Sequence, residues 1–335
     1  MSIGVPTRDG EAFLAQTLES LLAQDHGDFE IVVSDNASTD GTADIVRDFA
    51  RRDSRVRHER VEETLSAAQN FDRVFELTRG PYFMWAADDD LWDPSYVRRC
   101  VAALAADPAA VMACSGLRFI DPAGVIIDVD YERFDNPDLS SRSVVDRFQI
   151  LLQRSAWHQV YGLARRDALQ RTRLFRDIYG PDAILVMELA MLGPFARVHE
   201  PLFFYRRFPE RTEADRAERQ GGIADKAAVM TARTTYLQES MSEAVGLSAL
   251  SAAMKVRLRA EIIRAAYLGH TRMRSATKRE VAVRATAAAR DRDLGRLAKY
   301  SLARAVNALD GLPKAARRAG SGARRLAGRV RRRIS

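Results

Sequence analysis

Three consecutive aspartates, Asp88 to Asp90, directly follow the apolar segment Tyr82–Ala87. Neighbouring carboxylates repel one another, so such a run is tolerated either in open water or around a cation. Hard cations such as Mg²⁺ or Mn²⁺ take one or two carboxylates and complete their shell with water and substrate phosphates. The run therefore predicts a metal site. The alternative is a solvated turn in which Asp93 caps the next helix.

Polar residues also end two earlier apolar runs. Asp35 follows Phe29–Ser34, and a carboxylate at the end of a strand can accept hydrogen bonds from a base N–H or a ribose hydroxyl. The opening run, Ser2–Val5, leads into the turn Pro6-Thr7-Arg8. A helix cap or a turn residue would look the same, so spacing alone leaves both assignments open.

The segments around these residues alternate between strand and helix patterns. Short apolar runs predict strands, and apolar residues at helical spacing predict helices. The predicted strands cover 2–5, 29–35, 56–60, 81–87 and 109–120, and the predicted helices cover 11–24, 43–52, 65–77 and 94–108. This alternation predicts a mostly parallel α/β sheet flanked by helices, which places ligands at the carboxyl ends of its strands.

Beyond residue 120 the core pattern closes and then changes. Asp121–Ser143 is rich in Asp, Pro and Ser and predicts a long loop, and a helix over Val144–Gln153 and a last strand over 200–208 follow. From Thr212 onward the pattern is that of long helices rich in Ala, Arg and Leu. We expect an α/β domain at 1–208, a C-terminal all-helical extension at 209–310, and a basic, flexible tail at 311–335.

The positive charge of the chain is concentrated at one end. The 335 residues include 52 Lys and Arg against 45 Asp and Glu, a net charge of +7, with 47% hydrophobic residues. Nine of the cations lie in the acid-free segment 311–335, so the remaining body is close to neutral and a nucleic-acid-binding body is disfavoured. The tail fits contact with an anionic membrane or a solubilising end; it lacks the aromatic residues typical of nucleic-acid binding.

Cysteine content and the first residues bear on location. Cys100 and Cys114 are the only cysteines, so neither a disulfide framework nor a cysteine zinc site is expected. The N-terminus has no signal-peptide pattern, and no apolar stretch of about 18 residues predicts a spanning helix. We expect a cytoplasmic protein, with peripheral contact at the inner face of a membrane through the tail.

Taken together, three segments resemble the family 2 glycosyltransferases of the GT-A fold. SIGVPTRDGEAFLAQTLESLLAQ, FEIVVSDNASTDGT and YFMWAADDDLWDP occur in that family's order, and the likeness extends over residues 2–208. Within this family, the chain resembles the rhamnosyltransferase-like bacterial members that build glycans. The resemblance implies transfer of a hexose from a nucleoside diphosphate sugar, with Mg²⁺ or Mn²⁺ bridging the donor's diphosphate.

By this resemblance, the ends of the first strands bind the donor. Pro6, Thr7 and Asp9 correspond to the family's first nucleotide-contacting turn, and Asp35 corresponds to the acid at the nucleobase. Arg206, with Arg207 beside it, would pair with diphosphate oxygens.

The same resemblance assigns the aspartate run. Alignment on Pro94 makes Asp90 the principal metal ligand, supported by Asp89, and Asp88 a contact to ribose or metal. Ala87 stands where the family often has a first acid.

The acceptor side is assigned from two later segments. YGPDAILVMELAMLGPFARVHEPLFFYRR resembles the family's stretch that provides the catalytic base, and Asp182 is the matching acid, with a helix cap as its alternative role. Glu188 is the second candidate, although its place within the helix favours a charge that faces solvent. Trp157 and His158 match a segment near the acceptor, with core packing as the alternative.

These inferences lead to one main functional hypothesis. The chain is expected to be a metal-dependent, inverting glycosyltransferase that acts on a hydroxyl of a glycan or lipid-linked glycan in cell-envelope polysaccharide biosynthesis. The alternative is a catalytically inactive sugar-nucleotide-binding module docked to a membrane or partner by its basic tail. A hydride-transferring oxidoreductase is disfavoured, because no Gly-x-Gly-x-x-Gly follows the first strand.

Overall fold

A computed structural model describes most of the chain up to residue 272. The described residues are 1–127, 136–154, 157–178, 180–208 and 238–272. The contacts within the chain divide it into two compact units, Met1–Leu258 and Arg259–Ser335. The fold described below belongs to the first of these units.

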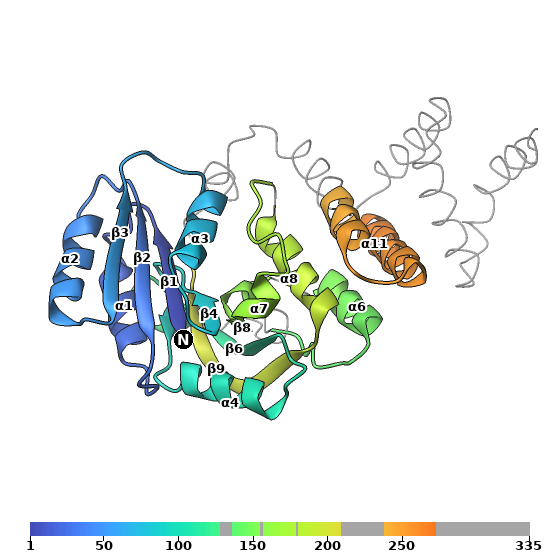
Figure 1. Cartoon of the computed structure of the whole chain (residues 1–335), viewed down its shortest axis with the longest axis horizontal. Helices are drawn as coiled ribbons and strands as arrows, with labels where there is room; N and C mark the ends of the chain where they lie inside the picture. Colours follow the sequence, from blue (N-terminus) through green and yellow to red (C-terminus); the bar gives the residue numbers. More distant parts are fainter. Residues whose placement is uncertain (128–135, 155–156, 179, 209–237, 273–335) are drawn as a thin grey trace, which may run out of the picture. The chain divides into compact units, whose positions relative to one another are not determined.

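A nine-stranded sheet forms the centre of this unit (Figure 1). Its strands are β1 (Ser2–Thr7), β2 (Glu30–Asn36), β3 (Val56–Val61), β4 (Tyr82–Trp85), β5 (Leu91–Trp92), β6 (Met112–Ile120), β7 (Ile126–Ile127), β8 (Leu163–Arg165) and β9 (Phe195–Arg206). Their order is β3-β2-β1-β4-β8-β6-β9-β5, with β7 paired to β6. The long pairings β1 with β2, β2 with β3 and β6 with β9 are parallel, which confirms the predicted fold class.

Helices cover the sheet and connect its parallel strands. They are α1 (Leu14–Leu22), α2 (Thr42–Arg52), α3 (Ala67–Glu76), α4 (Tyr96–Ala106), α6 (Val144–Arg154), η1 (His158–Tyr161), α7 (Arg166–Leu169) and α8 (Pro181–Leu192). A further helix, α11 (Ala252–Arg272), follows the last strand and runs from the end of the first unit into the second. In Figure 1, α2 and α3 lie on opposite sides of the β1–β3 strands. The connection from β2 to β3 therefore runs on one face of the sheet, and the connection from β3 to β4 runs on the other. β4 pairs with β1 on the side opposite to β2.

The core explains why the first helix forms where it does. Leu14, Leu18 and Leu21 are fully buried at helical spacing and pack with Ile3 and Ile31 of the sheet. Each buried side chain of this size contributes about 1.5–3 kcal/mol relative to an exposed one. The first helix and its strands are thus fixed by one continuous apolar cluster.

Several short elements, among them η1, β8 and α7, were not predicted from the sequence, and three further strands differ from the expectation. The short strand β5 directly follows the aspartate run, and β7 forms within the predicted long loop 121–143. β9 begins at Phe195 rather than near residue 200, because Phe195–Val198 pair with Met112–Ser115 of β6. The missed strands β5 and β7 each have only two residues, too few for an alternating pattern.

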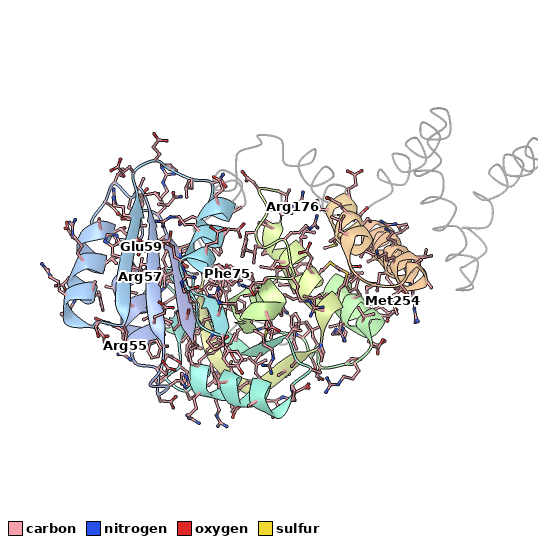
Figure 2. The ribbon with its side chains drawn as sticks, viewed as in Figure 1. Arg55, Arg57, Glu59, Phe75, Arg176 and Met254 are labelled. Atoms are coloured by element: carbon pink, nitrogen blue, oxygen red, sulfur yellow. The ribbon has the colours of Figure 1, made fainter. Side chains whose placement is uncertain are left out.

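The edge strand β3 is protected by charge. Figure 2 shows Arg57 and Glu59 along this strand, with Arg55 just before it. Arg57 Nε lies 3.1 Å from Glu59 Oε1, and its Nη1 lies 3.9 Å from Glu30 Oε2 of β2. Charged side chains on an exposed edge disfavour pairing with another chain.

The C-terminal predictions fall mostly outside the described residues. Within the described part, every helix is too short or too polar to cross a bilayer. Residues 238–247 and α11 are helical, as expected for the region beyond Thr212. The basic tail 311–335 and the boundary predicted at residue 310 lie outside the described residues.

Candidate active site

The carboxyl ends of several strands meet at one edge of the sheet. β1, β2 and β4 are parallel, and β6 and β9 share their direction because β8 pairs antiparallel with both β4 and β6. Thr7 and Asp35 are neighbours in register at the ends of β1 and β2. Open α/β sheets bind ligands outside the carboxyl ends of their strands, at the place where the connections change from one face of the sheet to the other. In this sheet that place lies between β1 and β4.

The first turn and the aspartate run are bonded directly. Thr7 Oγ1 donates a hydrogen bond to Asp88 Oδ2 at 2.5 Å. Gly10 lies against this pair, because a Cβ there would come within 2.5 Å of Thr7 Oγ1 and 2.8 Å of Asp88 Oδ2. This close approach requires glycine at position 10. The hydrogen bond between Thr7 and Asp88 joins two of the predicted donor-binding segments.

The turn after β1 is also bonded to the turn after β2. Asp9, at a φ of +51°, donates its N–H to Ser38 Oγ at 3.0 Å, and its Oδ1 accepts the N–H of Thr39 at 2.7 Å. Gly10 N–H donates to Thr42 Oγ1 at 2.8 Å. The Asp9 carboxylate thus holds the second turn, and its contact with a nucleotide stays a prediction.

Asp35 is fully buried, and its carboxylate is held by three residues. Oδ1 accepts the N–H of Ser38 at 2.9 Å, and Oδ2 lies 2.5 Å from Arg60 Nη1 and 3.3 Å from His58 Nε2. Burial opposes ionisation, but hydrogen bonds from Ser38, Arg60 and His58 outweigh it and lower the pKa of Asp35. The Arg60 side chain is 40% exposed, so a base reaching Asp35 would also meet this guanidinium.

Replacing Arg60 by alanine is expected to destabilise the chain by about 1–2 kcal/mol at neutral pH, because it removes one partner of a buried carboxylate. The lowered pKa of Asp35 adds stability above the ordinary value of 3.8, and this stability is lost as the pH falls through the lowered pKa. Urea unfolding of R60A and wild type should therefore converge in acid. Arg57→Ala is the control, because Arg57 is similarly exposed on the same strand but pairs with the partly exposed Glu30 and Glu59 rather than with a buried carboxylate; an equal loss in both variants would contradict the assignment.

Asp90 is completely buried beside the end of β9. Its Oδ1 accepts the N–H of Arg206 at 2.7 Å, and its carbonyl accepts Thr17 Oγ1 at 2.9 Å. Oδ2 has no hydrogen-bond partner among the described residues. Burial, together with the charges of Asp89 and Asp88, raises the pKa of Asp90 well above its ordinary value, against the effect of the Arg206 N–H.

The buried side chain of Arg206 joins three segments around the aspartate run. Its Nε donates to the Asp89 carbonyl at 2.6 Å, Nη1 donates to the Pro122 carbonyl at 2.7 Å, and Nη2 donates to Gln16 Oε1 at 2.9 Å. The guanidinium also lies 4.7 Å from the centre of the Phe13 ring. Pairing with a diphosphate would replace some of these bonds, so that role stays a prediction.

The aspartate run has the donor chemistry of a metal site but does not complete one alone. Within the described part of the chain, no three His, Cys, Asp or Glu side chains converge closely enough to hold an ion. The unpaired Oδ2 of Asp90 is the oxygen that fits a hard cation. Such an ion would need further oxygens from water and a substrate diphosphate, and the role of Asp90 and Asp89 as metal ligands stays a prediction.

Asp182 lies in the first turn of α8. The helix begins at Pro181 after Gly180, which has a φ of +65°, and Asp182 Oδ1 accepts the N–H of Ala183 at 2.8 Å. The residue reaches the surface in part, but its carboxyl lies deep enough for burial to raise its pKa above the ordinary value, against the Ala183 bond. A carboxylate with a raised pKa is suited to accept a proton.

Tyr161 connects the two groups of acids. Its pKa is raised well above the ordinary value, first by burial and then by the negative charges of Asp90, Asp89 and Asp182, among others. Contacts place Tyr161 between them: η1, which contains it, contacts α8, and the Tyr161 ring lies 5.6 Å from that of Phe203, which pairs with β5 just after the aspartate run.

The second candidate base, Glu188, is engaged in an ion pair. It is 7% exposed, so the expectation that its charge faces solvent was wrong. Its two oxygens accept the N–H of Arg173 at 2.8 Å and Nε of Arg173 at 2.6 Å. This pairing compensates the buried charge and leaves Asp182 as the better candidate.

Aromatic rings gather where η1 meets β9. The ring centroid of His158 lies 4.6 Å from that of Tyr205 and 6.1 Å from that of Phe119. Trp157 directly precedes η1 at a φ of +64°, and η1 also contacts α8, which carries Asp182. Flat rings suit a sugar face, but packing explains the same contacts, so the acceptor role of Trp157 and His158 stays a prediction.

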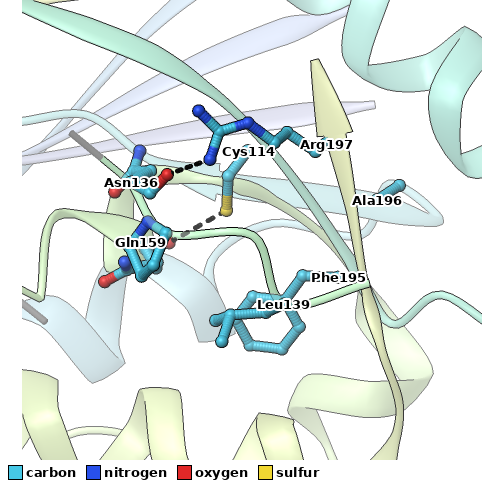
Figure 3. A pocket seen from close by; sticks show the side chains of 8 residues that line it. Cys114, Asn136, Leu139, Gln159, Phe195, Ala196 and Arg197 are labelled. Atoms are coloured by element: carbon cyan, nitrogen blue, oxygen red, sulfur yellow. Dashed lines mark hydrogen bonds between the residues drawn. The ribbon is translucent and has the colours of Figure 1, made fainter. Parts of the chain in front are cut away.

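A small cavity lies away from this edge. Cys114, Asn136, Gln159 and Arg197 are among its lining residues (Figure 3), near the amino-terminal parts of β6 and β9. Its volume of about 10 Å³ accommodates about one water molecule. It is too small for a sugar nucleotide.

Sequence reasoning missed His58, Arg60 and Thr17 as parts of the site. The register of β2 and β3 places Arg60 opposite Asp35, and His58 is two residues earlier on the same strand face. Thr17 is a polar residue on the buried face of α1. The sequence did contain a signal for these three residues: each is charged or polar at a position where the strand or helix pattern favours an apolar residue.

Comparison with known proteins identifies the class of protein that this site belongs to. The family model of glycosyl transferase family 2 matches residues 2–172. The chain therefore belongs to this family, as the resemblance of its strand-end motifs implied.

Individual relatives are distant. A Bacillus subtilis glycosyltransferase named for teichuronic acid biosynthesis is 30% identical over 92 residues, which cover 28% of this chain and 36% of the relative. An uncharacterized glycosyltransferase of Nostoc sp. is 27% identical over 206 residues, covering 58% of this chain and 60% of the relative. The matches thus span about a third to three fifths of these relatives.

Among solved structures, a fragment of S. aureus TarS in complex with UDP-GlcNAc has a similar fold. The TM-score is 0.61 at 15% identity, covering 79% of this chain and 71% of that chain. At this identity the likeness establishes the GT-A fold and nothing further.

Proposed function

We propose that the chain is a metal-dependent, inverting glycosyltransferase that moves a sugar of the hexose type from a nucleoside diphosphate sugar to a hydroxyl of a glycan or glycolipid. The observation that carries this proposal is the neighbourhood of Tyr161. Tyr161 lies in η1, which contacts α8, the helix with Asp182 in its first turn. The Tyr161 ring lies 5.6 Å from that of Phe203 on β9, the strand whose Arg206 N–H binds Asp90. A proton acceptor and a diphosphate-binding turn at one edge are what glycosyl transfer needs.

In the proposed reaction, the turns after β1 and β2 bind the nucleotide. Asp182 accepts the proton of the acceptor hydroxyl as that oxygen attacks the anomeric carbon opposite the departing diphosphate, which inverts the configuration. Asp90, with Asp89, would hold Mg²⁺ or Mn²⁺, which neutralises charge on the diphosphate when bound. Arg206 keeps the aspartate turn in place through its backbone bond to Asp90.

The names of similar proteins support the substrate class. The TarS fragment contains UDP-GlcNAc, and one relative is named for teichuronic acid biosynthesis. They support a nucleoside diphosphate sugar as donor and a cell-envelope polysaccharide as product. Neither points to rhamnose. The cytoplasmic location and the peripheral membrane contact through 311–335 remain predictions.

Thermal-shift measurements against UDP, dTDP and GDP, each with and without Mn²⁺, test the donor assignment. We expect stabilisation by one diphosphate that increases with Mn²⁺, since a ligand that binds the folded state raises its melting temperature. Slow hydrolysis of the matching nucleotide sugar should accompany it. Tight nucleotide binding without hydrolysis, and without transfer to any envelope glycan, would favour the inactive binding module. No metal-dependent shift with any nucleotide would contradict the proposal.

A further inference from the structure

The segment between α7 and α8 is attached to the donor side of the site through Phe175. Its N–H donates to Asp72 Oδ1 of α3 at 2.8 Å. Its ring, 7% exposed, lies 4.5 Å from the Phe71 ring and 5.1 Å from the Trp85 ring. One residue therefore makes a polar and an aromatic attachment to the same helix.

The partners of Phe175 belong to the elements that form the donor edge. Trp85 is the last residue of β4, immediately before the turn that carries the aspartate run, and its Nε1 donates to the Phe71 carbonyl at 2.9 Å. Asn70 of α3 donates to the Ser34 carbonyl of β2 at 3.1 Å. The anchor of Phe175 is thus rigidly connected to the ends of β2 and β4.

The same segment is attached to α8 through Arg173. Its N–H and Nε bind the two oxygens of Glu188, and its Nη1 lies 3.1 Å from Glu243 Oε1. Burial of Glu188 makes this pair costly to break, because one partner alone would leave a buried charge.

Leu174 separates the two anchors and holds an unfavourable backbone conformation. Its φ is +54°, in the left-handed region that costs a non-glycine residue of order 1 kcal/mol or more. Such a conformation persists when neighbouring contacts determine it. Here it directs Arg173 toward α8 and Phe175 toward α3.

We propose that Arg173–Phe175 is a positioning strap that fixes α8, and with it Asp182, relative to the donor edge. This proposal rests on the glycosyl transfer proposed above, in which Asp182 must reach an acceptor hydroxyl next to the bound donor. Asp72, Arg173 and Phe175 touch no reacting atoms in this scheme. They act by setting the distance between the base and the donor, and an error of about 1 Å in such a distance costs up to about a hundredfold in rate.

The test compares Phe175→Leu with Phe49→Leu. Phe49 lies on α2 and is 6% exposed, so both variants remove an equally buried ring, but only one belongs to the strap. For F175L we expect kcat for transfer to fall about tenfold or more, with nucleotide Kd unchanged and faster exchange of the hydrogen-bonded amides of α8 from Ile184 onward. For F49L we expect a similar loss of melting temperature without either effect. Asp72→Ala, which removes the acceptor of the Phe175 N–H and keeps the Phe175 ring, should change kcat and exchange in the same direction by less.

Two results would overturn the strap. One is unchanged exchange of the α8 amides in both F175L and D72A, which decides the question even if the wild type shows no turnover. The other is an equal fall of kcat in F175L and F49L. Failure of the proposed function is recognised separately, because it is the absence of turnover by the wild type with every donor and acceptor tried. If F175L does not fold, the exchange and kinetics of D72A carry the decision.

Discussion

Asparagine in place of Asp90 is expected to lower kcat at least about a hundredfold, without loss of stability in the metal-free protein. The loss of activity follows from charge, since a neutral amide is a poor ligand for a hard cation and gives up its stabilisation of the departing diphosphate. Steady-state kinetics with saturating donor, and Mn²⁺-dependent thermal shifts with nucleotide, measure this effect.

The unchanged stability of D90N follows from the environment of the carboxylate. The amide side chain of D90N would keep an oxygen for the Arg206 N–H, which Asp90 Oδ1 accepts at 2.7 Å. The mutation removes a charge that is fully buried, lies near Asp89 and Asp88, and has one oxygen without a hydrogen-bond partner among the described residues. Burying an uncompensated charge is costly, so the free energy of unfolding should be equal or higher in the variant.

Asp107→Asn serves as the matched control for D90N. Asp107 follows α4 and pairs with Arg142 at 2.9 Å, away from the aspartate run. This variant should keep both turnover and metal-dependent nucleotide binding. Undiminished Mn²⁺-dependent binding in D90N would exclude Asp90 as the metal ligand, and a large loss of stability would contradict the buried, unpaired state of its carboxylate.

The strand-end acids could be predicted from sequence because local signals coincided there. Asp35 and the aspartate run each interrupt an apolar run at the point where a buried strand ends, and strand order in a parallel sheet then brings such points together. The helices followed from apolar spacing, as with Leu14, Leu18 and Leu21. These features depend on neighbours in the sequence.

The partners of the acids could not be predicted in the same way, because they come from distant segments. Arg206 lies 116 residues from Asp90, and Arg60 meets Asp35 only through the register of two strands. Phe175 reaches Asp72 across 103 residues. Sequence patterns indicate which face of an element is buried, but the choice of contact among distant polar groups is decided by packing.

Replacing Asp182 by asparagine is expected to lower kcat by about 10²–10⁴-fold and to leave nucleotide affinity unchanged, because the variant loses its proton acceptor but no donor contact. The amide side chain of D182N would retain an oxygen for the Ala183 N–H, which Asp182 Oδ1 accepts at 2.8 Å, so α8 should begin at the same residue. Transfer rates at saturating donor and nucleotide binding measure the two effects.

The pH profile of kcat separates Asp182 from Glu188 as the base. A base works when deprotonated, so wild-type kcat should fall as the pH drops through the pKa of Asp182, which burial raises above its ordinary value. For stability the sign is opposite: a raised folded-state pKa favours folding at low pH, and this contribution is lost as the pH rises through that pKa. D182N should therefore be as stable as the wild type, or more stable, at neutral pH. Glu188→Gln should lower stability through the Arg173 pair and keep the acidic limb of the profile; loss of that limb in E188Q, with its persistence in D182N, would assign the base to Glu188 instead.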